Sequence, residues 1–182
     1  MNIRLRYNSL KGINKLFFIS RLNISSVNSI KSVYIKDLDG ISRKVNVLDI
    51  PSLEAESQNK IPVVILLGTG QTIQTFSPHF RHFSKYSRLI IPELRSQGKT
   101  ELLIQDCSMN QHINDLEYIL KGLNVSKCYI VGFSFGGRVS LAFAANCPGM
   151  VEKVSISCVP YTRPGGCVLC SMLWSQNIYI AI

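Results

Sequence analysis

The central part of the chain contains four short runs of β-branched and leucine residues, separated by longer and more polar stretches. The runs read IPVVILLG at residues 61–68, SRLIIPEL at 87–94, KCYIVG at 127–132 and VEKVSISCVP at 151–160. Nearly continuous apolar runs of this length are typical of strands that are buried on both faces, and such strands occur in parallel sheets. We therefore expect a parallel sheet with helices on both faces from residue 61 onward.

The first stretch between these runs has the spacing of an amphipathic helix. Phe76, Phe80 and Phe83 share one face of such a helix. Ser77 and Pro78 precede most of this face, and serine favours the N-cap while proline favours the first helical position. The sequence therefore predicts a helix that begins at Ser77-Pro78.

Two further helices are predicted from start and stop signals. Ser108 and Gln111 have the spacing of a capping box, and Gly122 lies near the expected helix end. A second helix, rich in small residues, runs from Gly136 to Pro148. The apolar face of the first of these helices comprises Ile113, Leu116, Leu120 and Leu123. Alternation of strands and helices with short loops predicts right-handed crossovers in a parallel sheet.

The residues before this sheet have a different pattern. Two runs with strand-like alternation, Ser32–Leu38 and Ile41–Ile50, flank Asp39-Gly40, which is a strong hairpin signal. Residues 51–60 are polar and are expected to form a loop. The fold class is therefore α/β, with a mostly parallel sheet and an N-terminal antiparallel hairpin. We assign residues 31–160 to this core, and residues 161–182 have apolar positions without a clear period.

Charge separates the N-terminal segment from the rest of the chain. The formal net charge is +9, but residues 1–36 contain seven basic residues and no acidic one, so the remainder is nearly neutral. A body without a basic stripe excludes nucleic acid as the expected partner. Residues 1–30 are rich in Arg, Ser and Asn, which is typical of a mitochondrial or plastid transit peptide. If this segment is only a basic tail, the expected location is the cytoplasm. No run of 18 apolar residues predicts a transmembrane helix.

The cysteines indicate free thiols. Cys128 and Cys158 lie in apolar runs and are expected to be buried. Cys167 and Cys170 form the one close pair, and no second pair follows at zinc-site spacing, so no metal site is expected. Free thiols fit a reducing compartment. The glycines do not form a Gly-x-Gly-x-x-Gly motif, and no cofactor is expected.

The third apolar run leads directly into Gly132-Phe133-Ser134-Phe135-Gly136, a Gly-x-Ser-x-Gly motif. A strand before the motif and a helix after it are the setting of a nucleophile elbow, so Ser134 is the candidate nucleophile. In so sharp a turn, side chains at Gly132 and Gly136 would collide with the backbone. The helix N-terminus at Ser134 favours developing negative charge. The alternative is an ordinary strand-to-helix turn, in which glycine and serine are also common.

With this motif the chain resembles the α/β-hydrolase fold superfamily, in the branch of single-domain lipases, esterases, epoxide hydrolases and MenH-like proteins. The resemblance covers residues 30–160 and rests on GFSFGG, on VILLGTGQT and on PELRSQGKT. It implies an oxyanion hole formed by the backbone N–H groups of Phe135 and Thr69. Leu67-Gly68 stands where many members have His-Gly, but a changed side chain need not remove a backbone donor.

The other members of a catalytic triad are missing from the expected positions. The resemblance implies an acid and then a histidine after the serine, whereas only Glu152 is acidic after Ser134 and no histidine follows. His79, His82 and His112 all precede the serine, and we expect them to be solvated or packed away from it. The chain therefore resembles the N-terminal two-thirds of the fold. Residues 161–182 correspond to the start of a cap region or to a mis-assembled end, and we expect a truncated sequence.

These observations lead to a serine α/β-hydrolase that acts on a small ester or thioester, and that is inactive as the 182-residue chain. Two alternatives remain at this stage. The chain is a non-catalytic pseudo-hydrolase that binds a ligand, or a MenH-like lyase on the same fold. Nothing in the sequence indicates an oligomeric state.

Overall fold

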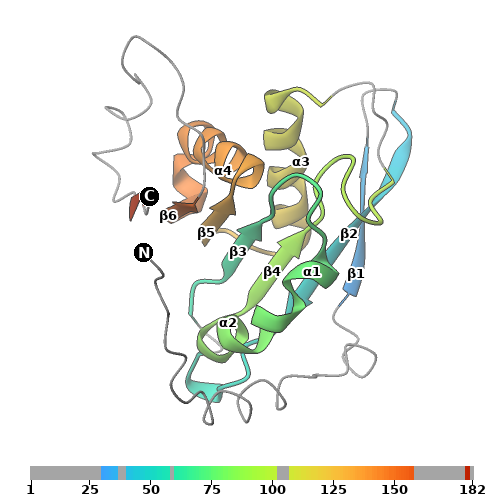
Figure 1. The fold of residues 1–182 in the computed structure, drawn as a ribbon. Coiled ribbons are helices and arrows are strands. Elements are labelled where there is room, and N and C mark those ends of the chain that lie inside the picture. The colour runs from blue at the N-terminus through green and yellow to red at the C-terminus, as the bar shows by residue number, and fades with distance from the viewer. Residues whose placement is uncertain (1–29, 37–39, 58–59, 102–106, 158–178, 181–182) are drawn as a thin grey trace, which may run out of the picture.

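A computed structural model of the chain describes residues 30–36, 40–57, 60–101, 107–157 and 179–180. Within these residues a seven-stranded sheet has the order β1-β2-β4-β3-β5-β6-β7 (Figure 1). The strands are β1 (Ile30–Lys36), β2 (Ser42–Ile50), β3 (Val63–Leu66), β4 (Leu89–Pro92), β5 (Cys128–Phe133), β6 (Val151–Ser157) and β7 (Tyr179–Ile180).

Strand direction follows the sequence pattern. β1 and β2 form an antiparallel hairpin, and β2 is also antiparallel to β4. All pairings from β4 through β3, β5 and β6 to β7 are parallel. The predicted fold class, a mostly parallel α/β sheet with an N-terminal antiparallel hairpin, is confirmed.

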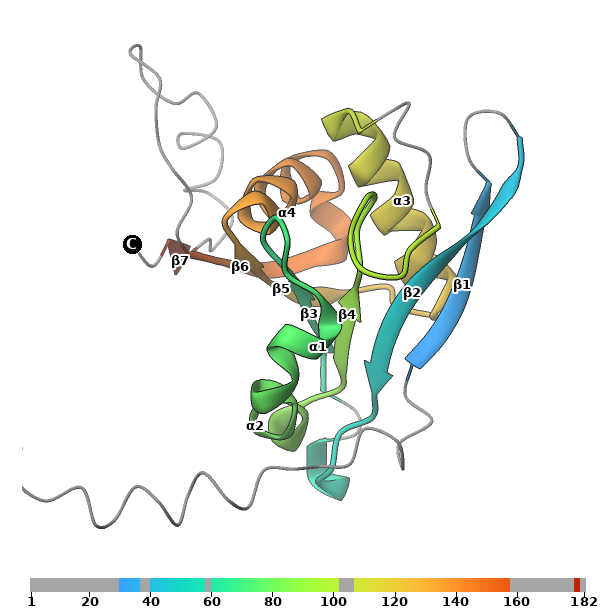
Figure 2. The ribbon, with the colours of Figure 1, turned by 45° about the vertical axis from the view of Figure 1, so that its right-hand side comes forward.

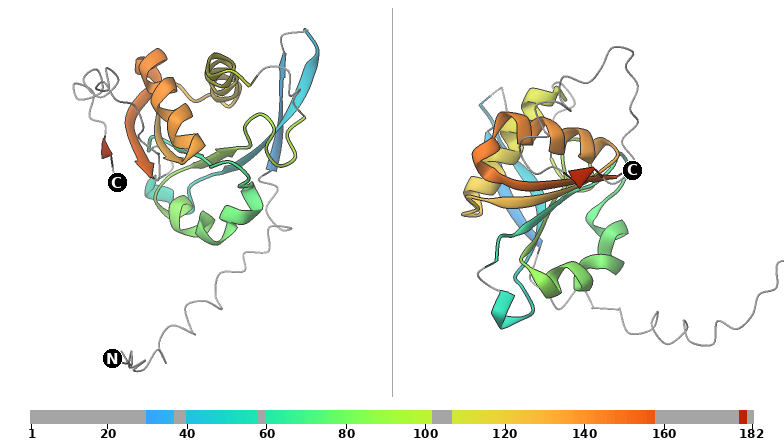
Figure 3. Two further views of the ribbon diagram at one scale, coloured as in Figure 1. Left: turned by 45° about the horizontal axis from the view of Figure 1, so that its top comes forward. Right: turned by 90° about the vertical axis from the view of Figure 1, so that its left-hand side faces the viewer.

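The helices connect the strands and cover both faces of the sheet (Figures 2 and 3). They are α1 (Ile73–Phe76), α2 (Phe80–Tyr86), α3 (Met109–Gly122) and α4 (Phe135–Asn146), with 3-10 turns η3 (Ala55–Ser57), η4 (Ser77–His79) and η5 (Pro148–Met150). Figure 3 shows α4 on one face of the sheet and α1 and α2 on the other. Since successive strand residues point to opposite faces, the two layers are packed by alternating positions of the same strands.

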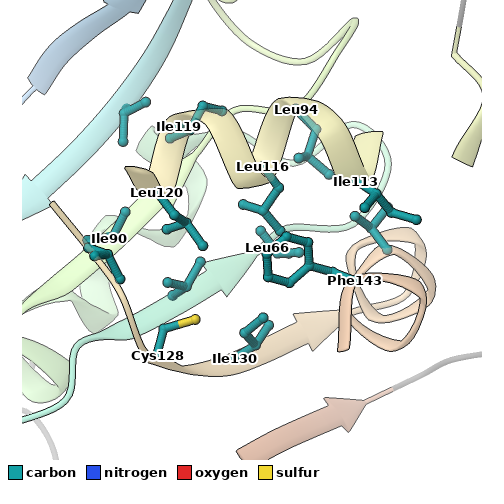
Figure 4. Packing of buried hydrophobic residues seen from close by; sticks show 14 of the residues in the cluster. Leu66, Ile90, Leu94, Ile113, Leu116, Ile119, Leu120, Cys128, Ile130 and Phe143 are labelled. Carbon is teal, nitrogen blue, oxygen red and sulfur yellow. The ribbon is translucent and has the colours of Figure 1, made fainter. Parts of the chain in front are cut away.

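Two apolar clusters correspond to the two layers. Leu66, Ile90 and Ile130 pack with Leu116 of α3 and Phe143 of α4 in the larger cluster (Figure 4). The strand residues between these positions belong to the other cluster, which they share with Ile73 and Phe80 of the α1–α2 layer: Ile65, Leu67, Leu89 and Ile91. The first two apolar runs therefore do form strands buried on both faces, β3 and β4, whereas in β5 and β6 buried positions alternate with half-buried or exposed ones.

The helix expected at Ser77-Pro78 begins earlier than predicted. Thr72 is the N-cap of α1, and its hydroxyl accepts the backbone N–H of Thr75 at 3.4 Å while the Thr75 hydroxyl accepts the backbone N–H of Thr72 at 3.0 Å. Pro78 instead falls in the 3-10 turn that joins α1 to α2. The prediction was wrong because a reciprocal cap formed by two threonines does not have the usual Ser/Thr-x-x-Glu/Gln signature.

A short strand lies in the C-terminal segment, for which the sequence pattern predicts no element. Tyr179 and Ile180 form β7 and pair with Ser155 and Ile156 of β6. Two residues carry too little pattern to be recognised as a strand. The predicted N-terminal segment before Ile30, and the three cysteines Cys158, Cys167 and Cys170, lie outside the described residues.

The described residues contain neither a bilayer-spanning helix nor a cluster of metal-ligating side chains. No helix among them is both long and apolar enough to cross a lipid bilayer. Within the same residues no group of three or more His, Cys, Asp or Glu side chains is arranged to hold a metal ion.

Candidate functional site

Ser134 lies between the end of β5 and the start of α4. Its backbone has φ 49° and ψ −114°. Residues other than glycine rarely have a positive φ. Such a conformation costs on the order of 1–3 kcal/mol and persists only where surrounding contacts impose it. The strand–turn–helix arrangement expected for the Gly-x-Ser-x-Gly motif is therefore present, with its strain at the serine.

The two motif glycines are required by close approach of the backbone. A Cβ atom on Gly136 would lie 2.2 Å from the carbonyl oxygen of Leu66 in β3. A Cβ on Gly132 would lie 2.6 Å from the Gly137 Cα in α4 and 2.3 Å from the Ser140 hydroxyl oxygen. Real Cβ atoms do not approach other atoms so closely, and the predicted reason for glycine at both positions agrees with these contacts.

Backbone hydrogen bonds hold the turn from both sides. The Ser134 N–H donates to the carbonyl oxygen of Ser157 at the end of β6, at 2.9 Å. The Ser134 carbonyl oxygen accepts the N–H groups of Gly137 and Arg138, which are in the first turn of α4. The buried Ser140 hydroxyl donates to the Gly136 carbonyl oxygen at 2.7 Å. The strained residue is thus fixed by a neighbouring strand and by its own helix.

The loop after β3 borders the same turn. A Cβ on Gly68 would lie 3.2 Å from the Ser134 Cβ and 3.3 Å from the Phe133 carbonyl oxygen. The loop turns sharply at Gly70, which has φ 76°. We call residues 68–72 the β3 loop. It places Thr69 directly after the residue that touches Ser134.

The backbone N–H groups of Phe135, in the serine turn, and of Thr69, in the β3 loop, have no acceptor among the described residues. Phe135 is the first residue of α4, so its N–H has no intrahelical acceptor. The N–H of Thr69 likewise has no acceptor in the described part of the chain. The Ser134 hydroxyl group also has no hydrogen-bond partner there. Together with the positive end of the α4 dipole, this arrangement can stabilise a negative charge that forms beside Ser134.

The buried carboxylate of Glu93 holds the loop that follows β4, and this loop lies next to the β3 loop. Glu93 follows β4, is fully buried, and has no ion-pair partner among the described residues. One carboxylate oxygen accepts the Ile73 N–H at 3.0 Å, and the other accepts the Asn46 side-chain amide at 2.8 Å and the Lys99 N–H at 2.7 Å. Gly98, with φ 54°, passes so close that a Cβ there would overlap the carboxylate. The sequence marks this loop as a motif, but no pattern in it predicts that Glu93 lies at its centre.

The histidines do not reach Ser134. His79 is exposed and its ring packs against Phe76 at 4.9 Å, and His82 is exposed and packs against Phe83 at 5.7 Å. His112 is packed and not solvated, because only 2% of it is exposed, and its ring meets the ring of Phe135, the residue after Ser134, edge-on at 5.1 Å. Helix periodicity alone does not predict this contact, since it depends on how α3 packs against α4.

Glu152 lies near the start of β6, whereas Ser157, which contacts the serine turn, lies at the end of this strand. Glu152 forms an exposed ion pair with Lys127 at 3.4 Å, whereas Ser157 at the end of the strand accepts the Ser134 N–H. Among the described residues, neither a histidine nor a carboxylate is in hydrogen-bond contact with Ser134. The structure therefore brings together Ser134, Phe135, Thr69 and the two glycines, but not a base or an acid.

Comparison with known proteins agrees with this geometry. The sequence model of a protein family described as "alpha/beta hydrolase fold" matches residues 61–163. Human epoxide hydrolase 4 is 29% identical over 103 residues, which are 55% of this chain and 28% of the human protein. A crystal structure of a probable hydrolytic enzyme from Pseudomonas aeruginosa PAO1 superposes with a TM-score of 0.64 at 18% identity, covering 70% of this chain and 40% of the other.

A third similar protein comes from an archaeon. A carboxylesterase structure from Nitrososphaera gargenis has a TM-score of 0.59 at 28% identity, covering 68% of this chain and 44% of the other. The chain therefore spans less than half the length of these three relatives. The residues matched by the family model, 61–163, include β3, β4, β5 and β6 and the serine turn.

Proposed function

Because the chain belongs to the α/β-hydrolase fold family, we propose that Ser134 is the nucleophile of a serine hydrolase that acts on a small ester or thioester. The observation that carries this proposal is the strained Ser134 backbone, with φ 49°, between a buried strand and a helix N-terminus. Strain of this kind is retained where function requires it. The relatives named as an epoxide hydrolase and a carboxylesterase support hydrolysis as the reaction class.

In the proposed reaction the Ser134 oxygen attacks the carbonyl carbon of the substrate and loses its proton to a base. The carbonyl π electrons move to the oxygen, which accepts hydrogen bonds from the Thr69 and Phe135 N–H groups. The carbonyl of the tetrahedral intermediate then re-forms as its bond to the alcohol or thiol breaks, and this leaving group takes the proton from the base. A water molecule that gives its proton to the same base attacks the acyl-enzyme, and the acid leaves as the Ser134 oxygen is reprotonated. Each backbone donor of this type contributes about 2.7–4 kcal/mol to transition-state stabilisation.

The base is the element that the described residues do not supply. None of the chain's three histidines is in hydrogen-bond contact with Ser134 in the described residues. A serine hydroxyl without an adjacent base is a weak nucleophile. We therefore expect that the 182-residue chain alone does not turn over an ester at an enzymatic rate.

A fluorophosphonate probe with added imidazole tests both statements. Without imidazole we expect no labelling of the full chain. Imidazole is small enough to act as a diffusible base, and we expect it to produce one adduct that peptide mass spectrometry locates at Ser134. Ser134→Ala should give no adduct under either condition.

The two parts of the proposal fail separately in this experiment. Strong labelling of Ser134 without imidazole would contradict the expected inactivity. An absence of any adduct in the presence of imidazole, on a chain that is folded by circular dichroism, would contradict the nucleophile assignment.

The absence of a described partner for the Ser134 hydroxyl also favours a second candidate, a non-catalytic binding module with the same serine turn. Ser134→Ala distinguishes the two. A binding module retains its affinity for a small ester when the hydroxyl is removed, and it forms no adduct with or without imidazole. A serine hydrolase loses the imidazole-dependent adduct.

A further inference from the structure

Both polar groups of the Gly68 backbone are held by glutamine residues. The Gly68 N–H donates to the side-chain oxygen of Gln71 at 2.7 Å. The Gly68 carbonyl oxygen accepts the Gln71 N–H at 3.1 Å and the side-chain amide of Gln97 at 3.1 Å. The Gly68 N–H is therefore occupied within the protein. Among the described contacts, the β3-loop N–H groups without an acceptor are those of Thr69 and Gly70, and Thr69 directly follows the residue next to Ser134.

The contact at the Gly68 carbonyl determines where the Thr69 N–H points. These two groups belong to one peptide unit, which is planar and trans, so they point in opposite directions. A donor that fixes the carbonyl oxygen of Gly68 on one side consequently fixes the Thr69 N–H on the other. Rotation of this peptide unit would move the Thr69 N–H away from its present direction.

Gln97 is a well-fixed donor. It is buried, and its side-chain oxygen accepts the Leu94 N–H at 3.2 Å. This contact requires the oxygen on the Leu94 side, so the amide nitrogen must face Gly68. The backbone N–H of Gln97 also donates to the Leu94 carbonyl oxygen at 3.0 Å. The donor is thus supplied by a loop that Glu93 and Gly98 hold in place from the end of β4.

We propose that Gln97 is a positioning residue of the oxyanion hole, which orients the Thr69 N–H through its hydrogen bond to the Gly68 carbonyl oxygen. This inference rests on the proposed function, because it gives the Thr69 N–H a role only if an oxyanion forms beside Ser134. Gln97 itself does not touch the reacting atoms. From the loop that follows β4, its side-chain amide holds the peptide unit between Gly68 and Thr69 in one orientation.

Nuclear magnetic resonance of the full chain tests the inference without requiring turnover. Diethyl phosphate is a tetrahedral anion and serves as a probe for the oxyanion hole. In the wild type, titration with diethyl phosphate should shift the backbone amide signals of Thr69 and Phe135. Gln97→Met, which keeps the side-chain length but has no donor, should lose the Thr69 shift, retain the Phe135 shift and weaken binding about fivefold.

Gln74→Met is the matched control. Gln74 is an exposed residue of α1 with no side-chain hydrogen bond among the described residues, and the chemical change is identical. This variant should bind diethyl phosphate as the wild type does.

Gln97→Glu provides a readout that a general loss of structure would not produce. The glutamate retains an oxygen for the Leu94 N–H, but it donates to Gly68 only when it is protonated. Titration of this variant from pH 5 to pH 9 should therefore restore the Thr69 shift at the acidic end and abolish it at the alkaline end. Diethyl phosphate remains an anion throughout, and Gln97→Met should show no such dependence.

The outcomes separate the two proposals. If neither amide of the wild type responds to diethyl phosphate, the oxyanion hole is contradicted and this inference is overturned with it. If both amides respond in the wild type and still respond in Gln97→Met and in Gln97→Glu at pH 9, the oxyanion hole stands and the positioning role of Gln97 is overturned.

Discussion

Gly136 and Leu66 are in direct backbone contact, because a Cβ atom at residue 136 would lie 2.2 Å from the Leu66 carbonyl oxygen. α4 therefore approaches β3 as closely as two backbones allow. The same approach brings the serine turn next to the β3 loop, where the Gly68 backbone lies beside Ser134.

Gly136→Ala is expected to destabilise the chain by about 3 kcal/mol, because neither backbone can yield by the distance that a methyl group needs. Urea unfolding followed by circular dichroism measures this change. Gly122→Ala is the control, since a Cβ there lies 3.9 Å from its nearest neighbour at the end of α3. That variant should gain about 0.5 kcal/mol from helix propensity, and equal effects at the two glycines would contradict the contact described here.

Ser134→Gly is expected to stabilise the chain by about 1 kcal/mol, because glycine adopts φ 49° without the strain that serine has there. Ser134→Ala keeps a Cβ and should change the free energy of unfolding by less than this amount. The difference between these two variants in urea unfolding combines the relief of backbone strain with the greater unfolded-state entropy of glycine, which opposes it. A glycine variant that is less stable than the alanine variant would contradict strain at this turn, because entropy alone gives that sign.

Stability should fall in acid through Asp49. Burial alone would raise the pKa of Asp49, but hydrogen bonds from Arg88 and Lys31, together with their charges, outweigh burial and lower this pKa below its usual value. Arg88 donates to the two carboxylate oxygens at 2.8 and 2.9 Å, and Lys31 donates at 2.6 Å. A lowered pKa in the folded state contributes stability above the unfolded-state pKa, and this stability is lost as pH falls through the folded-state value.

Asp49→Asn removes this titration. We expect its free energy of unfolding to depend less on pH than that of the wild type between about pH 5 and pH 2. Urea unfolding at a series of pH values gives both curves. Parallel curves over this range would show that Asp49 does not contribute to acid sensitivity.

The three described cysteines should differ in reactivity. Cys128 is buried, and burial raises the pKa of its thiol to about 12, so almost none of it is thiolate at pH 8. Cys107 is exposed, and Cys147 is half-buried with a pKa that burial raises above the usual value. Iodoacetamide at pH 8 should modify Cys107 first and Cys128 only after denaturation, as peptide mass spectrometry can follow. Early modification of Cys128 would contradict its buried position in β5.

Sequence patterns predicted the features that depend on local residues. The strand–serine–helix turn followed from GFSFGG between an apolar run and small residues, and Ser108 does accept the Gln111 N–H at 3.2 Å as expected for a cap. The apolar face of α3 is buried as its spacing predicts. Each of these features is determined within a few residues of the chain.

Features that depend on distant segments were missed. His112 is on the helix face that meets α4, and no periodicity in α3 alone indicates that Phe135 will cover it. Gln97 is unremarkable in sequence, and its importance comes from the loop of another strand. The start of α1 at Thr72 was missed for a different reason, because its cap uses an uncommon pair of residues.

The turn at Ser134 has a consequence for the order of folding events. It needs the Leu66 backbone on one side and the Ser157 carbonyl oxygen on the other, and these come from strands on either side of β5 in the sheet. Contacts between distant segments form only after the chain entropy of loop closure has been lost. We therefore expect the strained conformation of Ser134 to form late in folding. Ser140→Ala removes the hydrogen bond to the Gly136 carbonyl oxygen at the base of this turn. In stopped-flow measurements this variant should unfold faster than the wild type and fold at the same rate.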